Sequence, residues 1–413
     1  MRIIHAADLH LDSPLRGLIP YEGAPIAAVR EATRHAFERM IAFAIDSKAA
    51  LLLIAGDLYD GDWRDFSTGL FFAKEMSRLR EAGVRVVIVR GNHDAASQIT
   101  RALRLPENVR ELSSRKPETV AFDELGIAVH GRSFPERAVT DDLTRDYPRP
   151  VDGALNFGLL HTCLDGRAGH EPYAPCKLEA LRGRGYDYWA LGHVHQREVV
   201  ARDPWVVFPG NLQGRHVREP GAKGATVIDV GNGHIESVEH VPFDVVRWVE
   251  TFVDVAPSAR VHDVLDAARE VLAVELERAE GRVLAARVVV RGDESAIARV
   301  SATRDAVTAE LQAIANDLGG VYFEKLRVEV VSRAPRASSG EWLDALGSLA
   351  DVTDDELRAI ADDALGELRE KLPIDLTSGA DALLLDDLGV LRGLLQEAQQ
   401  AILVRAREPE EDT

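Results

Sequence analysis

Short apolar runs alternate with helical patterns at the start of the chain. Residues 2–6, 51–55 and 84–89 are short runs rich in Ile, Leu and Val, as expected for buried strands. Residues 28–48 and 66–82 lie between these runs and repeat apolar side chains at helical spacing, which predicts two amphipathic helices. This β-α-β-α-β order predicts an α/β unit. A polar motif follows each strand, at the edge of the sheet where α/β proteins bind ligands.

After residue 109 the pattern changes to shorter runs suited to strands. These runs occupy residues 119–122, 127–132, 156–161, 188–191, 205–208, 225–230 and 235–241. A helix is expected between two of them, over residues 175–183. Together with the first unit, the runs predict two facing sheets flanked by helices, with catalytic loops at one end.

A domain boundary is expected near residues 243–248, beyond which strands and helices alternate again. Strands are predicted at 248–255, 282–291 and 322–331, and helices at 260–279 and 295–316. Residues 334–340 are rich in Pro, Arg and Ser, which is typical of a linker. The predicted organisation is a catalytic domain over 1–245, a small α+β domain over 246–333, a helical segment over 341–405 and an acidic, disordered tail over 406–413.

The composition indicates a globular protein of the cytoplasm. Hydrophobic residues make up 46% and charged residues 28% of the 413 residues. The sequence has no apolar run near the roughly 20 residues that cross a bilayer, and it begins without a signal-peptide pattern. The two cysteines, Cys163 and Cys176, are too few for a disulfide framework. We therefore expect a cytoplasmic protein that does not bind membranes.

The net charge of −19 argues at first against a nucleic-acid substrate, whose phosphates attract Lys and Arg. The charge is unevenly placed, however. Residues 1–250 hold 31 basic and 35 acidic residues, a net of −4, whereas residues 251–413 carry the remaining −15. Several acids of the first part would also be offset by bound metal ions. The acidic excess therefore lies away from the candidate site.

Five motifs at the ends of strands carry residue types that bind metals. In chain order they are Asp8-x-His10, Gly56-Asp57, Gly91-Asn92-His93-Asp94, His161 and Gly192-His193-x-His195. Each motif alone has an ordinary explanation, such as a turn or a hydrogen-bonded core histidine. Their shared position after strands and their complementary ligands instead indicate one metal site.

The residue types favour a site for two divalent cations. Two such ions about 3.5–4 Å apart can clamp a phosphate and hold a hydroxide in line for attack. They need a bridging anionic ligand, and Asp57 is the candidate. His93 follows Asn92 directly, so it can face the substrate as proton donor or as a stabiliser of transition-state charge. Asp94 is expected to orient His93 or to raise its pKa.

This motif set resembles the calcineurin-like metallophosphoesterase superfamily. More closely, the chain resembles the SbcD-type DNA repair nucleases and, among them, the bacterial YhaO-like exonucleases. The resemblance covers about residues 1–245. It rests on residues 6–15 (AADLHLDSPL), 56–60 (GDLYD), 91–94 (GNHD), 159–163 (LLHTC), 189–195 (WALGHVH) and 209–219 (PGNLQGRHVRE).

The resemblance implies a four-layer αββα sandwich of the α/β class with a two-metal site. It implies one metal position formed by Asp8, His10, Asp57 and His195, and a second formed by Asp57, Asn92, His161 and His193. His93 takes the position of the family's catalytic histidine. The expected metal is Mn²⁺, with Fe²⁺ or Zn²⁺ as alternatives, because imidazole and carboxylate together suit these ions.

The resemblance also implies a substrate and partners. The expected function is a two-metal DNA nuclease of DNA repair, an exonuclease that could also cut internally, with the small domain as a cap over the DNA. The C-terminal helices would bind a separate coiled-coil ATPase of the SbcC or YhaN type, and the family is expected to form a homodimer. Arg215, His216 and Arg218 are candidate phosphate contacts. Their alternative is an ion-pair cluster with Glu219.

Two other functions stay open at this point. The same site could hydrolyse a small phosphodiester or nucleotide, or the chain could mainly serve as a scaffold for an ATPase partner. The intact ligand set argues against the scaffold. The 209–219 block and the small domain favour DNA over a small diester.

Overall fold

The computed structural model describes residues 1–13, 19–60, 66–96, 104–166, 173–331, 352–371, 385 and 387–405. The chain divides into two compact units. The first comprises residues 1–254, 261–290 and 304–328, and the second comprises residues 255–260, 291–303 and 329–413. In the described part, no helix is long and apolar enough to cross a membrane.

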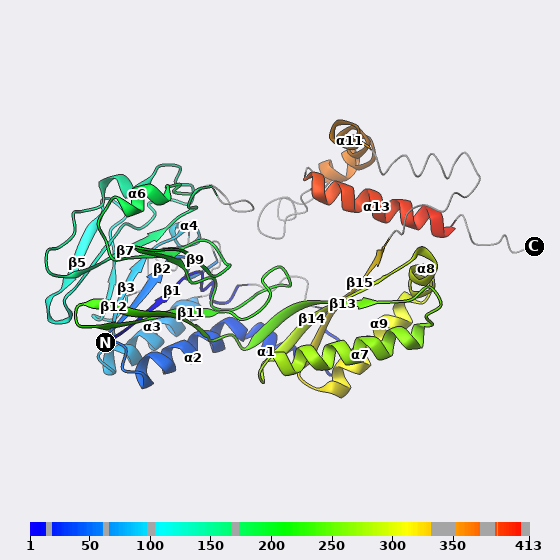
Figure 1. Cartoon of the computed structure of the whole chain (residues 1–413), viewed down its shortest axis with the longest axis horizontal. Helices are drawn as coiled ribbons and strands as arrows, with labels where there is room; N and C mark the ends of the chain where they lie inside the picture. Colours follow the sequence, from blue (N-terminus) through cyan, green and yellow to red (C-terminus); the bar gives the residue numbers. More distant parts are fainter. Residues whose placement is uncertain are drawn as a thin grey trace, which may run out of the picture. The chain divides into compact units, whose positions relative to one another are not determined.

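The first unit contains a six-stranded mixed sheet in the order β12-β11-β1-β2-β3-β4 (Figure 1). Its strands are β1 (Arg2–Ala6), β2 (Leu51–Ala55), β3 (Arg85–Val89), β4 (Val109–Glu111), β11 (Gly224–Gly231) and β12 (His234–Pro242). Strands β1 to β4 are parallel, while β11 pairs antiparallel with both β1 and β12. The carboxyl ends of β1, β2 and β3, where the polar motifs begin, therefore meet at one edge.

A second six-stranded sheet has the order β5-β6-β7-β8-β10-β9. Its strands are β5 (Glu118–Phe122), β6 (Ile127–Gly131), β7 (Leu155–His161), β8 (Tyr188–Gly192), β9 (Glu198–Arg202) and β10 (Trp205–Phe208). The four central strands are parallel and the two edge strands antiparallel. The remaining short elements here are α4 (Asn92–Ala96), η1 (Asp123–Leu125), η2 (Leu143–Asp146) and α6 (Leu178–Arg182).

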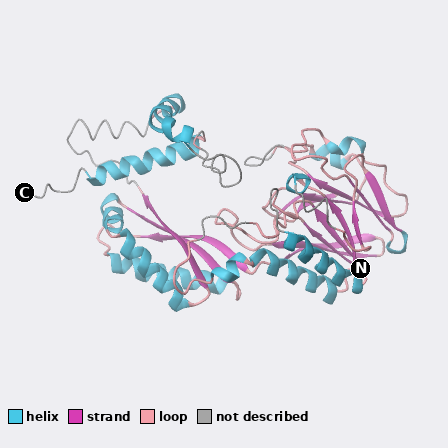
Figure 2. Ribbon diagram, turned by 180° about the vertical axis from the view of Figure 1, so that it is seen from behind, coloured by secondary structure: helices cyan, strands magenta, loops and turns pink. Residues whose placement is uncertain are grey.

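Three apolar layers hold helices and sheets together. Helices α2 (Ala32–Asp46) and α3 (Phe66–Glu81) cover the outer face of the first sheet, where Phe37 and Met76 pack with Ile54, and the short helix α1 (Ile26–Arg30) precedes α2. Between the sheets, Leu53 and Val87 belong to one core cluster with Phe157 and Leu159. On the far face of the second sheet, Trp189 and Phe208 pack with Leu181 of α6. The layers run αββα, as expected (Figure 2).

A three-stranded sheet follows in the order β13-β14-β15, with strands β13 (Val246–Asp254), β14 (Val283–Gly292) and β15 (Val321–Val330). Helix α7 (Val261–Arg278) contacts β13 and α9 (Arg304–Leu318). Trp248 of β13 and Tyr322 of β15 belong to a core cluster with Val29 and Ala32 of the first two helices. The predicted strands of this region are confirmed, and the predicted domain bounds stay a prediction.

The second unit contains α8 (Glu294–Ala302), α11 (Asp354–Lys371) and α13 (Leu388–Arg405). Leu357 and Ala361 of α11 pack with Leu391 of α13. Helix is therefore confirmed over part of the predicted segment 341–405. The predicted linker 334–340 and tail 406–413 lie outside the described residues.

Two predicted helices are each divided in two, and two strands were missed. The helix predicted at 28–48 breaks at Glu31, and the one predicted at 295–316 breaks at Thr303. Thr303 is β-branched, and its φ of −118° and ψ of 27° depart from helical values. The missed strands, β4 and β9, both lie at the edge of a sheet, where the apolar pattern is weak. Strand β4 is also only three residues long.

His5 on β1 joins the two sheets and makes stability depend on pH. Its ring is buried between the Tyr188 hydroxyl, 3.0 Å from Nδ1, and the Leu191 carbonyl, 3.1 Å from Nε2. Burial lowers the pKa of His5 from 6.5 to about 3. The folded protein therefore resists a proton that the unfolded chain accepts, so stability is lost as pH falls from about 6.5 toward 3.

A His5→Gln variant is expected to show a flatter pH dependence of unfolding than the parent protein. Between pH 7 and 5, the free energy of unfolding of the parent should fall by up to about 2 kcal/mol more than that of the variant. Urea unfolding at both pH values measures this difference. An equal fall in the free energy of unfolding in the two proteins would exclude His5 as a source of the acid sensitivity.

Candidate metal centre

The backbone at the strand ends turns sharply to bring ligands together. Asp8, His10, Asp57 and His193 all have positive φ, at 50°, 42°, 52° and 102°. Each such conformation costs about 1–3 kcal/mol and persists only where neighbouring structure enforces it. Here the amides of Asp8 and His10 donate to the carbonyls of Gly56 and Asp57, both at 3.0 Å. These bonds hold the loops after β1 and β2 against each other.

Glycines precede several of these ligands because the loops approach closely. A Cβ on Gly91 would collide with the carboxylate of Asp57, and one on Gly192 would collide with the carbonyl of Ala55. The Asp57 carboxylate accepts from the His93 amide at 3.0 Å, and the Ala55 carbonyl belongs to β2, so both atoms are held in place. The glycines of the motifs therefore permit the short spacing between the ligand loops.

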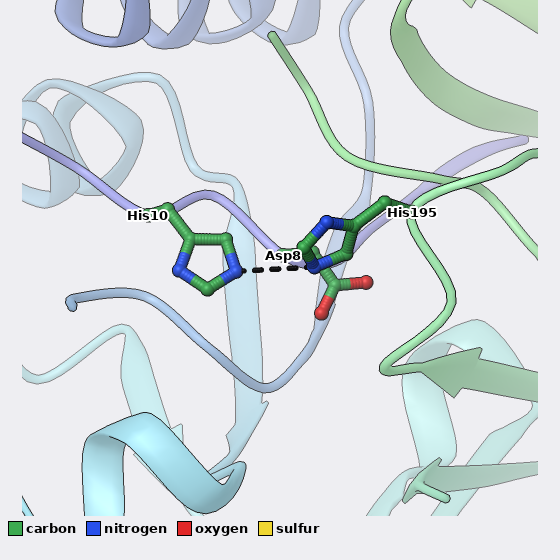
Figure 3. A group of neighbouring side chains, drawn as sticks. All are labelled: Asp8, His10 and His195. Carbon is green, nitrogen blue, oxygen red and sulfur yellow. Dashed lines mark hydrogen bonds between the residues drawn. The ribbon is translucent and has the colours of Figure 1, made fainter. Parts of the chain in front are cut away.

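A first group of ligand atoms consists of Asp8, His10 and His195, which lie within 4.8 Å of one another. Asp8 and His10 come from the loop after β1, and His195 comes from the loop after β8 (Figure 3). The Nε2 atoms of the two imidazoles face each other at 3.3 Å. Burial, and then the charge of Arg215, lower the pKa of His10 to about 4, so its ring is neutral at pH 7. A neutral imidazole is the form that binds metals.

The outer nitrogens of both imidazoles are held by carboxylates. His10 Nδ1 lies 2.6 Å from Asp60 Oδ1, and His195 Nδ1 lies 2.7 Å from Glu219 Oε1. When each carboxylate accepts a hydrogen bond from the N–H at Nδ1, the Nε2 of each neutral ring carries a lone pair. Two lone pairs directed at each other over 3.3 Å require a cation or a proton between them. The donor set therefore fits a metal ion.

A second group consists of Asp8, Asp57 and His161. The ring of His161 donates from Nδ1 to the Ala55 carbonyl at 2.9 Å, so its Nε2 carries a lone pair. That Nε2 lies 3.0 Å from Asn92 Oδ1 and 3.5 Å from Asp57 Oδ2. Three electron-pair donors therefore converge on one point, which again fits a cation.

Asp57 faces both groups. Its Oδ2 is 3.9 Å from His10 Nε2 as well as 3.5 Å from His161 Nε2, and its Oδ1 accepts from the His93 amide at 3.0 Å. Although burial acts to raise the pKa of Asp57, the surrounding imidazoles hold it well below its usual value. Burial and the charge of Asp57 raise the pKa of neighbouring Asp8. Two crowded carboxylates of this kind are stabilised by divalent ions.

His193 contributes to the second group through its backbone and the position of its ring. Its amide donates to both oxygens of Asp8 at 3.1 Å. The centroid of its ring lies 5.2 Å from that of His161 and 5.9 Å from that of Tyr173. The seven predicted ligands thus gather at one edge of the two sheets.

His93 lies beside the metal-binding groups, and its side chain is 31% exposed. Its ring centroid is 5.0 Å from that of His10, and its Nδ1 is 3.8 Å from Asp60 Oδ1. His10, Asp60 and His93 form a third convergence of possible ligand atoms. The side chain of His93 is more exposed than those of His10, at 1%, and His195, at 25%.

The carboxylate of Asp94 accepts hydrogen bonds from the backbone of two loops. Its buried carboxylate accepts hydrogen bonds from the amides of Leu58 at 2.8 Å, Tyr59 at 3.2 Å and Gly91 at 3.1 Å. These bonds tie the loop after β2 to the loop after β3. Asp94 therefore positions the ligand loops. Asp60 Oδ1 lies 3.8 Å from His93 Nδ1, and the role predicted for Asp94 toward His93 stays a prediction.

Asp60 and Glu219 are functional residues that the sequence analysis missed. Asp60 ends the block GDLYD, and Glu219 ends the block at 209–219, so both stood inside recognised motifs. Their distance in sequence from His10 and His195 hid the pairing. The sequence did contain one signal: a carboxylate that lies inside a metal-binding motif but has no ligand role is a candidate partner of a ligand imidazole.

The three candidate phosphate contacts lie in different surroundings. The side chain of Arg215 is 11% exposed, and its guanidinium pairs with Glu219 at 3.2 Å and with Asp60 at 3.5 Å. His216 Nε2 lies 3.7 Å from Glu219, and Arg218 is exposed. The alternative predicted for this cluster, ion pairs with Glu219, is present. Phosphate contact by the three residues stays a prediction.

Comparison with protein families gives two matches. The model of the calcineurin-like phosphoesterases matches residues 1–197, and the model of the middle domain of the metallophosphoesterase YhaO matches residues 248–331. Because the second match lies over the β13-β14-β15 sheet, the likeness extends beyond the metal site.

Individual relatives agree with the family matches. A protein of Bacillus subtilis called uncharacterized metallophosphoesterase YhaO is 36% identical over 296 residues, which is 71% of this chain and 72% of the relative. The DNA double-strand break repair protein Mre11 of Methanopyrus kandleri is 32% identical over 232 residues, 51% of this chain and 48% of that protein.

A crystal structure of a dimetal phosphatase from Danio rerio aligns with 56% of this chain and 93% of its own, at 10% identity and a TM-score of 0.34. A score this low supports no argument. The family assignment rests instead on the matched models, the relative that is 36% identical and the converging His and Asp side chains. The chain belongs to the calcineurin-like metallophosphoesterases, is YhaO-like within them, and is related to the Mre11 and SbcD nucleases.

Proposed function

We propose that this chain is a two-metal DNA nuclease that hydrolyses phosphodiester bonds in DNA repair, as an exonuclease and also as an endonuclease. One observation carries the proposal. Two groups of His and Asp side chains converge, Asp57 Oδ2 faces an imidazole of each group, and the partly exposed imidazole of His93 lies beside them. That arrangement suits in-line attack on a phosphorus atom with a separate proton donor on the leaving side.

The protein's own residues would divide the work. Asp57 would be shared by the two cations. His161 and Asn92 would hold one cation, and His10 and His195 would hold the other. When bound, the ions would supply an activated water and charge stabilisation at the phosphate. His93 would donate a proton to the leaving oxygen. Mn²⁺ is the proposed metal, with Fe²⁺ or Zn²⁺ as alternatives, because the donors are imidazole and carboxylate.

Two features support DNA as the substrate. The Mre11 relative is named for the repair of DNA double-strand breaks, and it matches over half of this chain. The acidic excess lies beyond residue 250, so the part with the metal ligands has a net charge of only −4 before ions bind. Two bound divalent ions would offset that charge and place positive charge at the site, where a phosphate could bind.

We also propose that the C-terminal helices serve partner binding. Helices α11 and α13 pack on each other through a small apolar cluster, and Ile360, Val390 and Leu394 are at least one-third exposed. A separate coiled-coil ATPase subunit is the proposed occupant, and a homodimer of this chain is the second assembly to test. Chemical crosslinking of the purified protein, alone and with its candidate ATPase, distinguishes the two.

The proposed function is tested with end-labelled linear duplex DNA and Mn²⁺, beside a chromogenic small phosphodiester. Cleavage of the DNA that disappears with a chelator is expected. The rate of DNA cleavage by an Asn92→Ala variant should be lower by about 100-fold or more, since one ligand of the second group is removed. This variant also excludes a contaminating nuclease. Fast turnover of the small diester without any DNA cleavage would overturn the nuclease proposal and leave a small-molecule phosphodiesterase.

A further inference from the structure

The carboxylates behind the first metal group belong to one network. Asp60 holds the Nδ1 of His10 and Glu219 holds the Nδ1 of His195, although the two carboxylates lie in different loops. Glu219 is 6% exposed and Asp60 22%. Two buried or partly buried carboxylates that hold neighbouring ligands repel each other unless a cation lies between them.

Arg215 is that cation. Its Nη2 donates to Glu219 Oε1 at 3.2 Å, and its Nη1 lies 3.5 Å from Asp60 Oδ1 and 3.4 Å from the hydroxyl of Ser13. Its own amide donates to Glu219 Oε2 at 2.8 Å. The planar guanidinium can pair with two carboxylates at once, whereas a lysine ammonium does so poorly.

The loop that carries Arg215 is anchored at both ends. Before it, the side chain of Gln213 donates to the Val246 carbonyl at 2.6 Å and accepts from the Val246 amide at 3.2 Å. The indole of Trp248 donates to the Gly214 carbonyl at 2.8 Å. Beyond it, Lys223 Nζ donates to the His195 carbonyl at 2.9 Å. Strand β13 therefore fixes the loop that reaches the ligands.

We propose that Arg215 is a positioning residue that sets the metal affinity of the group formed by Asp8, His10 and His195, and that it does not bind the DNA phosphate. Its terminal nitrogens already face carboxylates, so a phosphate would have to displace Asp60 or Glu219. Through these carboxylates Arg215 fixes the ring planes of His10 and His195 at once. The proposal rests on the two-metal site of the proposed function but not on DNA as the substrate.

Titration of the metal-free full-length protein with Mn²⁺, followed by electron paramagnetic resonance, tests the proposal. In the parent protein, occupation of both positions should replace the signal of isolated Mn²⁺ with that of a spin-coupled pair. An Arg215→Met variant should need about 10–100-fold more Mn²⁺ for the coupled signal, as for other residues that orient metal ligands. The first Mn²⁺, bound by the His161 group, should bind with nearly unchanged affinity.

A matched control is available in Arg287, whose guanidinium pairs with Glu324 at 2.7 and 2.8 Å on the small sheet. Arg287→Met also deletes a carboxylate-paired arginine but should leave the Mn²⁺ titration unchanged. Arg215→Lys should restore part of the affinity, since it keeps the charge but not the planar fork. If Arg215→Met misfolds, Arg215→Lys alone tests the proposal, since it keeps the positive charge and should still need more Mn²⁺ than the parent protein for the coupled signal.

The two explanations of Arg215 predict different outcomes. A titration identical to that of the parent protein, combined with weaker and less salt-sensitive DNA binding, would overturn the positioning role and make Arg215 a phosphate contact. Because the Mn²⁺ titration contains no DNA, it remains informative if the chain cleaves none. Weakened coupled Mn²⁺ binding in a protein without nuclease activity would support the positioning role and overturn only the proposed function.

Discussion

An Asp57→Asn variant is expected to lose about 1,000-fold or more in phosphodiester turnover, because a bridged metal pair contributes several kcal/mol to the transition state. Asp57 Oδ2 faces His161 Nε2 at 3.5 Å and His10 Nε2 at 3.9 Å, so one carboxylate serves both groups. The amide removes the negative charge that two neighbouring cations share. It keeps an oxygen that can accept from the His93 amide, as Asp57 Oδ1 now does at 3.0 Å.

Calorimetric titration with Mn²⁺ measures the effect on binding separately from activity. The parent protein should bind two ions, and the Asp57→Asn variant should bind one in the same concentration range. Asp229→Asn is the control, since Asp229 on β11 pairs with Arg2 at 2.9 Å and belongs to neither ligand group. Binding of two ions by Asp57→Asn with unchanged affinity would show that Asp57 is not the bridge.

The ligand set was predictable from sequence because its geometry is local to strand ends. Asp8, Asp57 and His161 each follow or end an apolar run, and parallel strands bring such positions to one edge. The glycines beside them also act locally, since a Cβ on Gly91 would block the Asp57 side chain and one on Gly192 would block the Ala55 backbone. Position along a strand was therefore enough to group these residues.

The supporting residues were not predictable because their partners are distant in sequence. Asp60 meets His10 across 50 positions and Glu219 meets His195 across 24, and no periodicity encodes either pairing. The backbone contacts of Asp94 were not predictable either. Asp94 is adjacent to His93 in sequence, yet its carboxylate accepts from the backbone of the loop after β2. Adjacency in sequence does not determine which contacts two consecutive side chains make.

A His93→Ala variant is expected to lower kcat for DNA cleavage by about 100- to 10,000-fold, the range for removal of a general acid. The side chain of His93 is 31% exposed and lies next to both ligand groups, with its ring centroid 5.0 Å from that of His10. Substrate binding and Mn²⁺ stoichiometry should change little, because the Asp57 contact uses the backbone amide of His93 and survives the substitution. Single-turnover cleavage of end-labelled DNA measures the loss.

The leaving group separates proton donation from charge stabilisation by His93. The alkoxide released from DNA needs a proton, whereas nitrophenolate, the leaving group of a chromogenic diester, departs without one. If His93 is the proton donor, His93→Ala should therefore lose far more activity on DNA than on the chromogenic diester. Equal losses on both substrates would assign His93 to stabilising the charged phosphate instead. Full activity on DNA would remove His93 from the catalytic machinery and leave Asp60 as the carboxylate of His10 alone.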